Sequence, residues 1–349
     1  MPTSDNVKAR KRIAIVTMGV KLGDETRGYT RFRFLAEFLA QKGYKVDLIT
    51  SSFQHWNKAQ RDVNSAEYLG LPYRVVFIHE PGYKRNLDLR RIRSHAVAAR
   101  GMADYFARHA GQYALIYSEI PPNDVALACA EAAERDGIPY VADINDLWPE
   151  AMRMVVDIPV VSDIAFHSFT RDARKVYRML AGAVGTSDEY AARPAADRSA
   201  PYPHVTCYVG NELAEFDAGV AAHANEVQKP AGEFWVMYTG TLGASYDLST
   251  TIRAAAALVE DMPGLRVKIL GDGPDREKLE TLAARLNAPV DFVGYTPYPM
   301  MAAYLSKCDI TLNSLVKDAP QSIVTKIGDY LAAGKPMLNT GSSPEMRAK

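Results

Sequence analysis

Short apolar runs alternate with helical patterns along almost the whole 349-residue chain. The run at 13–17 is followed by a polar loop, an amphipathic segment around 32–39 and a second apolar run at 46–50. Such a succession is typical of a βαβ unit with parallel strands. The alternation resumes after the polar, alanine-rich segment 211–232. The sequence therefore predicts an α/β protein with two doubly wound, Rossmann-like domains, residues 1–211 and 212–349.

Composition excludes several classes of protein. Basic and acidic residues number 41 each, which argues against a general nucleic-acid binder. The three cysteines are far apart and form no C-x-x-C pair, so a reducing compartment without a structural metal is expected. No apolar run reaches the length of a membrane span, and the N-terminus lacks the apolar core of a signal peptide. We expect a cytoplasmic protein.

The stretch 319–341 joins polar side chains to one helical face. Its apolar residues recur at helical spacing: Ile323, Ile327, Tyr330 and Leu331. The pattern predicts a helix with Gln321 and Ser322 at its N-terminus and Lys326 one turn in, ended by Gly334. A helix N-terminus and a nearby cation favour phosphate binding. An ordinary amphipathic helix of an α/β domain explains the same pattern.

Three glycine-bearing turns follow predicted strands in the second half. They contain Gly240, Thr241, Leu242 and Gly243 in the first turn, Gly271 and Gly273 in the second, and Gly294 in the third. Parallel sheets bind ligands at the carboxyl ends of their strands, and glycine lets backbone N–H groups approach a phosphate closely. Each turn alone is weak evidence, but together with the helix start they favour a nucleotide site.

Polar residues also follow strands in the first half. Glu119 comes after one strand, and Asp143, Asn145 and Asp146 come after another. Carboxylates at a strand end can orient sugar hydroxyls or move a proton. The alternative for Asp146 is that it caps a helix starting at Leu147.

The segment 84–108 combines seven basic residues with a helical apolar pattern. The face of that pattern comprises Leu89, Ile92, Ala96, Ala99, Ala103 and Phe106. A basic amphipathic helix can lie on an anionic membrane. The commoner arrangement packs the apolar face on the sheet and leaves the basic side in solvent.

Four consecutive motifs in the second half resemble the family-four retaining glycosyltransferases of GT-B fold. In chain order they are YTGTLGASYDL, ILGDGPDREKLE, VDFVGYTPYPMMAAYLSKCDI and GDYLAAGKP. DINDLWPEA and YVGNELAEF agree in the first half, and DLWPE resembles the branch that builds bacterial surface polysaccharides and O-antigens. The resemblance implies two Rossmann-like domains facing across a cleft. Members continue through more helices after the last motif, so the second domain here looks incomplete.

The resemblance also implies roles for individual residues. The family has two glutamates separated by seven residues in its donor site, and this chain has Gln321 and Asp329 there. Asp329 is expected to bind ribose and Gln321 the transferred sugar. Lys326, the turns at Gly240, Thr241, Leu242, Gly271, Gly273 and Gly294, and Ser322 complete the expected donor site. Arg27, Gly28, Glu119 and Asn145 are expected on the acceptor side, with Asp143, Asp146 and Lys326 as catalytic candidates.

These observations predict transfer of a sugar from a nucleoside-diphosphate sugar, UDP favoured, to a glycan or polyprenyl-linked acceptor. Lys326 and N–H groups would stabilise the leaving diphosphate, so no metal and no cofactor are expected. No nucleic acid is expected as a partner, and peripheral contact with the plasma membrane is compatible with the sequence. Two alternatives stay open: a non-catalytic nucleotide-sugar-binding module or glycosyltransferase partner, and a non-hydrolysing nucleotide-sugar epimerase.

Overall fold

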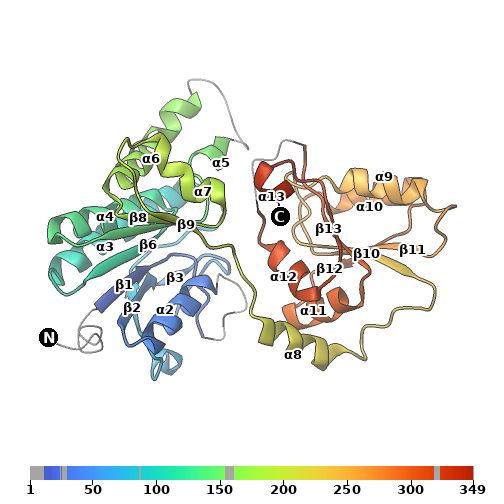
Figure 1. Cartoon of the computed structure of the whole chain (residues 1–349), viewed down its shortest axis with the longest axis horizontal. Coiled ribbons are helices and arrows are strands. Elements are labelled where there is room, and N and C mark those ends of the chain that lie inside the picture. The colour runs from blue at the N-terminus through green and yellow to red at the C-terminus, as the bar shows by residue number, and fades with distance from the viewer. Residues whose placement is uncertain are drawn as a thin grey trace. The chain divides into compact units, whose positions relative to one another are not determined.

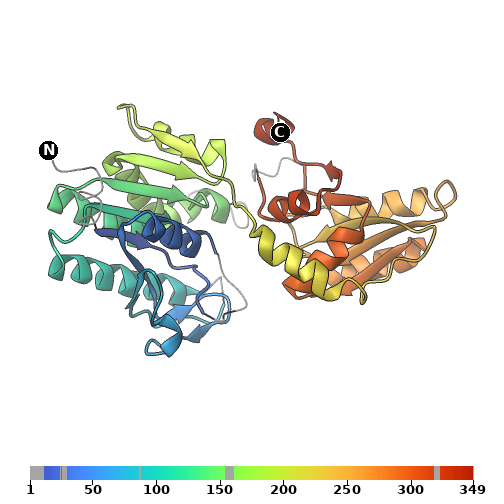
Figure 2. The same cartoon turned by 60° about the horizontal axis from the view of Figure 1, so that its bottom comes forward.

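A computed structural model describes residues 12–23, 25, 30–85, 88–153, 161–317 and 323–348. The chain divides into two compact units, Met1–Tyr208 and Val209–Lys349, each built on its own parallel sheet. Figures 1 and 2 show both sheets with helices on either side. The predicted α/β class with two Rossmann-like domains is confirmed. No helix among the described residues is long and apolar enough to cross a bilayer.

The first unit is a seven-stranded sheet in the order β5-β2-β1-β6-β7-β8-β9. Its strands are β1 (Arg12–Val16), β2 (Lys45–Ser51), β5 (Arg74–Ile78), β6 (Leu115–Ile120), β7 (Tyr140–Ile144), β8 (Gly182–Gly185) and β9 (His204–Thr206). Its helices are α2 (Arg31–Gln41), α3 (Leu89–Arg108), α4 (Asn123–Asp136), α5 (Glu150–Arg153), α6 (Val161–Met179) and α7 (Asp188–Ala192). A hairpin of β3 (Phe53–Gln54) and β4 (Ala59–Gln60) follows β2, and two 3₁₀ turns, η1 (Ala66–Tyr68) and η2 (Arg193–Ala196), complete the unit.

Side-chain alternation along the strands of the first unit explains its two cores. Ile13 and Ile15 of β1 pack with Phe32 of α2 on one face of the sheet. Ala14 and Val16 point to the opposite core, which α3, α4 and α6 cover. Because both faces are covered, the strands are apolar runs rather than alternating ones, as the sequence indicates.

The second unit is a five-stranded sheet in the order β12-β11-β10-β13-β14. The strands are β10 (Phe234–Thr239), β11 (Leu265–Leu270), β12 (Val290–Gly294), β13 (Ile310–Asn313) and β14 (Met337–Asn339). The helices are α8 (Leu213–His223), α9 (Leu248–Ala257), α10 (Arg276–Leu286), α11 (Tyr298–Lys307), α12 (Lys326–Ala333) and α13 (Pro344–Ala348). One core contains side chains of α9 and α10, and the other contains those of α8, α11 and α12.

Two helices differ from the sequence prediction. Helix α12 begins at Lys326, so Lys326 is its first residue, whereas the apolar pattern placed the start at Gln321. Helix α3 buries Ser94, His95, Ala98, Met102, Tyr105 and Phe106, so Phe106 is the one member of the predicted face that is buried. Leu89 and Ile92 lie exposed. The large side chains near the C-terminal end of α3, Tyr105 and Phe106, join the core with Tyr113 and thereby set the rotation of the helix.

Candidate functional site

The three glycine turns of the second unit pack directly on one another. Gly240 N–H donates to Leu270 O at 2.9 Å, and Gly271 N–H donates to Gly294 O at 2.8 Å. Gly240, Gly271 and Gly294 have φ values of 134°, 142° and 89°, which L side chains rarely adopt. A Cβ atom at Gly271 would lie 1.8 Å from Gly240 O. The turns therefore form one continuous layer of backbone at the carboxyl ends of β10, β11 and β12.

Several N–H groups of these turns are used in contacts between the turns and are not free to bind a phosphate. The N–H groups of Gly240 and Gly271 already donate to neighbouring turns, and Leu242 N–H donates to Asp272 O at 3.0 Å. A Cβ atom at Gly273 would lie 2.2 Å from Leu242 O. The prediction that these N–H groups are open to a phosphate is therefore wrong for Gly240, Leu242 and Gly271. Their glycines are needed for close contact between turns, while Thr241 lies exposed at the surface of this layer.

Lys326 occupies an unusual position beside this layer. Its side chain is 7% exposed, and Nζ makes no hydrogen bond with any described residue. Nζ lies 3.9 Å from the ring centroid of Tyr238 and 3.8 Å from that of Tyr246. It also faces Gly240, where an added Cβ would lie 3.0 Å away. Burial lowers the pKa of Lys326 to about 7. The arrangement leaves the amine ready for an anionic partner that the described residues do not supply.

Asp329 follows Lys326 by one turn of α12 and is half-buried. Asn211 Nδ2 donates to Asp329 Oδ1 at 2.8 Å. Tyr298 OH lies 2.5 Å from Asn211 Oδ1 and 3.2 Å from Asp329 Oδ1. Burial raises the pKa of Asp329 to about 6. These contacts hold Oδ1 and orient the carboxylate, and no described residue donates to Oδ2. Asn211 and Tyr298 lie in motifs that carry the family resemblance, but the sequence does not connect either of them with Asp329, because the contact is formed only by the fold.

The remaining expected donor residues, Gln321 and Ser322, lie outside the described residues, as do Arg27 and Gly28 of the first unit. Their roles stay predictions. The prediction that Gln321 and Ser322 form the N-terminus of this helix is wrong, because α12 begins at Lys326.

In the first unit, Asp143 lies inside β7 and is fully buried. Arg31 Nε donates to Asp143 Oδ2 at 2.8 Å and Arg31 Nη2 to Oδ1 at 3.1 Å. Tyr117 OH donates to Oδ2 at 2.5 Å. Both carboxylate oxygens are thus engaged in a buried ion pair. This pairing gives Asp143 a structural role, and neither of its carboxylate oxygens is left without a hydrogen bond.

Glu119, Asn145 and Asp146 lie at the carboxyl ends of β6 and β7. Glu119 accepts hydrogen bonds from Thr17 Oγ1 at 2.6 Å and Met18 N–H at 3.0 Å, and burial raises its pKa to about 7. Asn145 Nδ2 donates to Asp143 O at 3.0 Å.

Asp146 accepts hydrogen bonds from Leu147 N–H at 2.9 Å and Trp148 Nε1 at 3.0 Å. No helix starts at Leu147, because α5 begins at Glu150. The helix-cap alternative for Asp146 is therefore wrong, and its carboxylate orients Trp148 instead.

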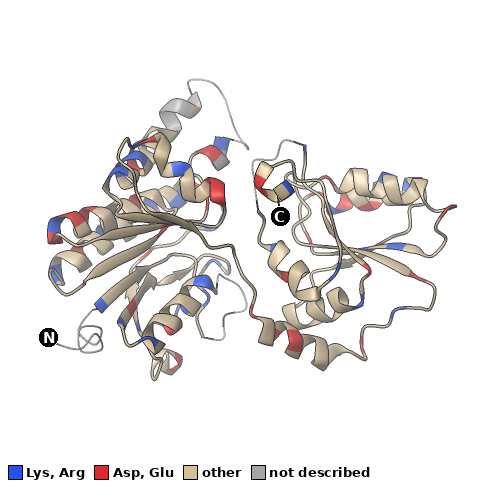
Figure 3. Cartoon of the chain, in the orientation of Figure 1, with Lys and Arg blue, Asp and Glu red and all other residues tan. Residues whose placement is uncertain are grey.

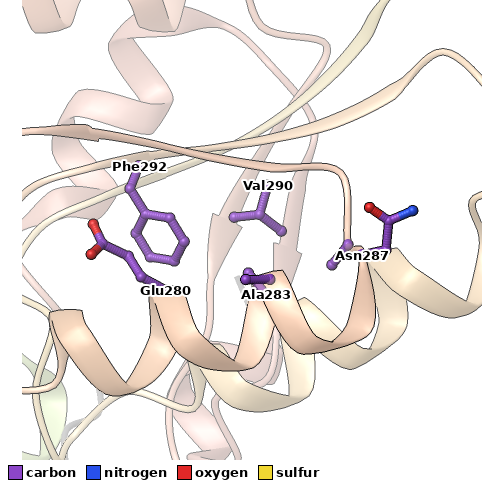
Figure 4. A pocket seen from close by; sticks show the side chains of 7 residues that line it. Glu280, Ala283, Asn287, Val290 and Phe292 are labelled. Atoms are coloured by element: carbon purple, nitrogen blue, oxygen red, sulfur yellow. The ribbon is translucent and has the colours of Figure 1, made fainter.

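A pocket of about 240 Å³ lies between α10 and β12. Figure 4 shows its lining: Glu280, Ala283, Ala284, Asn287, Ala288, Val290 and Phe292. None of the glycine-turn residues, Lys326 or Asp329 line it. Across the described residues, His, Cys, Asp and Glu form no group of three that could hold a metal ion.

Comparison with known proteins gives this geometry a context. Residues 233–348 match the model of the family described as Glycosyl transferases group 1. No curated protein matches the chain.

Several solved structures share the fold. Sucrose-phosphate synthase from Thermosynechococcus elongatus is 18% identical, with a TM-score of 0.61 over 94% of this chain and 80% of that one. Anabaena HepE, solved in complex with UDP, is 15% identical, with a TM-score of 0.61 over the same shares. WaaG, a glycosyltransferase of lipopolysaccharide biosynthesis, is 13% identical, with a TM-score of 0.58 over 94% of this chain and 80% of that one. The chain has the GT-B fold, and with its group 1 domain it is a glycosyltransferase.

Proposed function

We propose that the chain transfers a sugar from a UDP-sugar to a glycan or lipid-linked acceptor, with retention of the anomeric configuration, during synthesis of a bacterial surface polysaccharide. One observation carries the proposal: the buried Lys326 amine, without a hydrogen-bond partner among the described residues, at the edge of the second sheet where the glycine turns meet. Parallel sheets bind nucleotides at that edge. A buried polar group of this kind favours a ligand that supplies the missing partner.

The diphosphate of the donor supplies that partner. An ammonium in a poorly hydrated site attracts a phosphate oxygen more strongly than one in water, and the charge-assisted hydrogen bond is short and strong. The attraction grows when the glycosidic bond breaks, because negative charge then accumulates on the leaving diphosphate. Lys326 thus contributes more to the transition state than to the bound donor, which is the requirement for catalysis. The N–H of Thr241, an exposed residue of the first glycine turn, is proposed to assist.

Asp329 is proposed to accept hydrogen bonds from the ribose hydroxyls through Oδ2, while Asn211 and Tyr298 hold Oδ1. The preference for UDP draws support from HepE, which was solved with UDP and with UDP-glucose. Gln321 would contact the transferred sugar, as the family resemblance implies. The surface-polysaccharide role draws support from DLWPE and from the lipopolysaccharide enzymes WaaG and WaaB, which share the fold.

On the acceptor side, Glu119, Asn145 and Asp146 are proposed to meet acceptor hydroxyls, with Arg27 and Gly28 near the phosphates. Asp146 is half-buried, and the hydrogen bonds that it accepts from Leu147 N–H and Trp148 Nε1 fix the direction of its carboxylate. Retention of configuration rests on the resemblance to the family-four enzymes.

Gln321 in place of an acid favours one second candidate, a binding module that holds the nucleotide sugar without transferring it. Incubating the full chain with a panel of UDP-, GDP- and ADP-sugars and measuring nucleoside-diphosphate release distinguishes the two. We expect release from a UDP-sugar, and proton NMR of the product to show the donor's anomeric configuration. Binding of UDP without release for any sugar or acceptor extract would support the binding module. No binding of any nucleoside diphosphate would overturn the donor site itself. Lys326→Ala should lower both binding and release, and Lys307→Ala, at an exposed lysine of α11, should lower neither.

A further inference from the structure

A cluster of basic and aromatic side chains lies at the carboxyl ends of strands in the first unit. The turn of the β3–β4 hairpin, which follows β2, supplies His55 and Lys58. Tyr83 follows β5, and Arg91 comes from the first turn of α3. Because β2 and β5 are paired in parallel, these segments meet at the edge of the sheet where such folds bind ligands.

Tyr83 is the centre of this cluster. Lys58 Nζ lies 4.8 Å from its ring centroid, and the Arg91 guanidinium lies 5.5 Å from it. Lys58 has a φ of 54°, a left-handed conformation that residues other than glycine seldom adopt, so the hairpin holds this lysine at a cost in backbone energy. Over the ribbon as a whole, basic and acidic residues are interspersed (Figure 3). Here two cations share one aromatic ring.

His55 adds a third hydrogen-bond donor to the two cations. Burial and the charges of Lys58 and Arg91 lower the pKa of His55 to about 4, so its imidazole is uncharged near neutrality. Burial raises the pKa of Tyr83 to about 12, so its hydroxyl keeps the proton and donates a hydrogen bond to His55 Nδ1. Lys58 Nζ lies 3.4 Å from the same nitrogen. With donors at Nδ1, the imidazole carries its own proton on Nε2.

The acid beside the cluster is Glu80, which partly balances the two cations. It is 3% exposed, and its oxygens accept hydrogen bonds from Ser94 Oγ at 2.8 Å and from Ser51 Oγ at 2.5 Å. The three groups gathered on Tyr83 are donors, and two of them are cations. A ligand that complements them brings several acceptor oxygens and a negative charge, as a carboxylate or a phosphate does.

Two tryptophans relate this cluster to a sugar acceptor. Trp56, in the turn of the same hairpin, is 36% exposed, and its ring centroid lies 5.0 Å from that of His55. An exposed indole offers an apolar face on which the ring of a sugar can pack. Trp148 lies with its ring centroid 4.7 Å from the Arg91 guanidinium, and its Nε1 donates to Asp146 at 3.0 Å. The cluster therefore adjoins one of the acceptor contacts proposed above.

We propose that the acceptor is an acidic sugar, and that Lys58, Arg91 and His55 bind its carboxylate or phosphate group. The inference rests on the proposed function and specifies the class of acceptor. An anionic group gains charge-assisted hydrogen bonds from the two cations, whereas a neutral hydroxyl at the same place gains weaker ones. The cluster thus favours an acidic sugar over its neutral counterpart.

Titration calorimetry of the full chain with small sugars, in the presence of UDP, tests the proposal. We expect methyl glucuronide, glucose 6-phosphate or both to bind at least about twentyfold more tightly than methyl glucoside, from about fivefold per cation. The tighter of the two acidic sugars tells whether a carboxylate or a phosphate is the group recognised. The preference should fall as salt rises.

Lys58→Gln and Arg91→Gln should each lower the preference for the acidic sugar about fivefold and change the affinity for methyl glucoside little. The matched controls are Lys175→Gln and Arg100→Gln, which remove exposed cations of the same unit, the second from the same helix as Arg91. They should leave the preference unchanged. Structural damage lowers the affinity for both sugars alike and shows in the melting curve, so the ratio of the two affinities reports the charge alone.

Equal affinity for acidic and neutral sugars would overturn the proposal, as would an unchanged preference in both variants or no binding of either acidic sugar. Inorganic phosphate that binds as tightly as glucose 6-phosphate would show a bare anion site and overturn the assignment to a sugar acceptor. Titration with UDP alone separates this inference from the proposed function. Failure of UDP to bind overturns the donor site, whereas normal UDP binding without a preference for acidic sugars overturns only the acidic acceptor.

Discussion

Replacing Lys326 by methionine should stabilise the folded protein and weaken donor binding at the same time. Methionine keeps the length and the apolar stem of the side chain and removes the charge. In the fold, Nζ is buried and makes no hydrogen bond with a described residue, so the ammonium lacks the hydration it has in the unfolded chain. The same absence of a partner is what makes Lys326 useful to a diphosphate. The two effects therefore have a common origin and opposite signs.

The magnitude of the stabilisation follows from the pKa of Lys326, which burial lowers from 10.5 to about 7. At about 1.36 kcal/mol for each unit of pKa, this difference corresponds to at most about 5 kcal/mol. The rings of Tyr238 and Tyr246 offset part of the cost, since each contact with an ammonium contributes about 0.5–2 kcal/mol. We expect Lys326→Met to raise the free energy of unfolding by about 1–3 kcal/mol at low pH.

The gain should depend on pH in a defined direction. Below pH 7 lysine is protonated in both states, and the full cost of burying the charge is present. Between pH 7 and 10.5 the unfolded chain binds the extra proton, so the stability of the wild type rises with pH and the advantage of the mutant fades. Urea unfolding of both proteins measures the effect. Suitable conditions are about pH 6, below the folded pKa of Lys326, and about pH 7.5 and 9, between its folded and unfolded pKa values.

Calorimetric titration with UDP supplies the second half of the measurement. Loss of a charge-assisted hydrogen bond of about 1.5–3 kcal/mol should weaken UDP about 10- to 150-fold. Lys307→Met, at an exposed position, should leave stability and UDP affinity unchanged. A mutant that is less stable at every pH, or one that binds UDP normally, would refute the account of Lys326 given above.

Four further outcomes are expected. Asp329→Asn should weaken UDP about tenfold in titration calorimetry, because an amide has fewer acceptors than a carboxylate; normal affinity with earlier melting would make Asp329 purely structural. Glu119→Gln should flatten the fall in wild-type stability between pH 4.5 and 7, where the raised pKa of Glu119 lets the folded state hold the extra proton, and an unchanged slope in urea unfolding contradicts this. Gly271→Ala should cost about 3 kcal/mol or more in urea unfolding, because its Cβ meets Gly240 O, whereas Gly43→Ala, with open space around it, should cost about 1 kcal/mol. Transfer should survive excess EDTA, and an activity that EDTA abolishes and Mg²⁺ restores would exclude the metal-free site.

The architecture could be predicted because it depends on local patterns. A parallel strand covered on both faces is an apolar run, and Ile13–Val16 of β1 is one. Glycine at a strand end is likewise visible in the sequence, and Gly240, Gly271 and Gly294 all have positive φ. What the sequence could not show is which atoms these glycines accommodate. A Cβ at Gly271 meets the carbonyl of Gly240, thirty-one residues away, and only the paired strands β10 and β11 bring the two together.

The phase of a helix is set by the largest residues that find a core, rather than by the mean position of all its apolar residues. In α3, Tyr105 stacks against His109 and its hydroxyl lies 2.7 Å from that of Tyr113, while Phe106 packs edge-on against Tyr113. These contacts rotate Leu89 into solvent. A helical pattern that gives Leu and Ala equal weight ignores these larger side chains, and it therefore predicts that Leu89 is buried.

The contacts of Asn211 and Tyr298 with Asp329 could not be predicted from the sequence, because they join segments that are far apart in the chain. Asn211 precedes α8 and Tyr298 opens α11, yet their side chains meet the carboxylate of α12 within 2.8 Å and 3.2 Å. Gly328 lets this happen, because a Cβ there would lie 3.2 Å from Val209 O and 3.7 Å from Asn211 Cβ. A small residue in the first turn of α12 thus brings the segment before α8 against the helix, and Asn211 then orients the acid next to it. Asp329 is oriented by contacts that no spacing in the sequence encodes. The residues alone indicate Lys326 as a cation close to a predicted helix start, whereas it is the resemblance to the family's donor-site pattern that implies a role for Asp329.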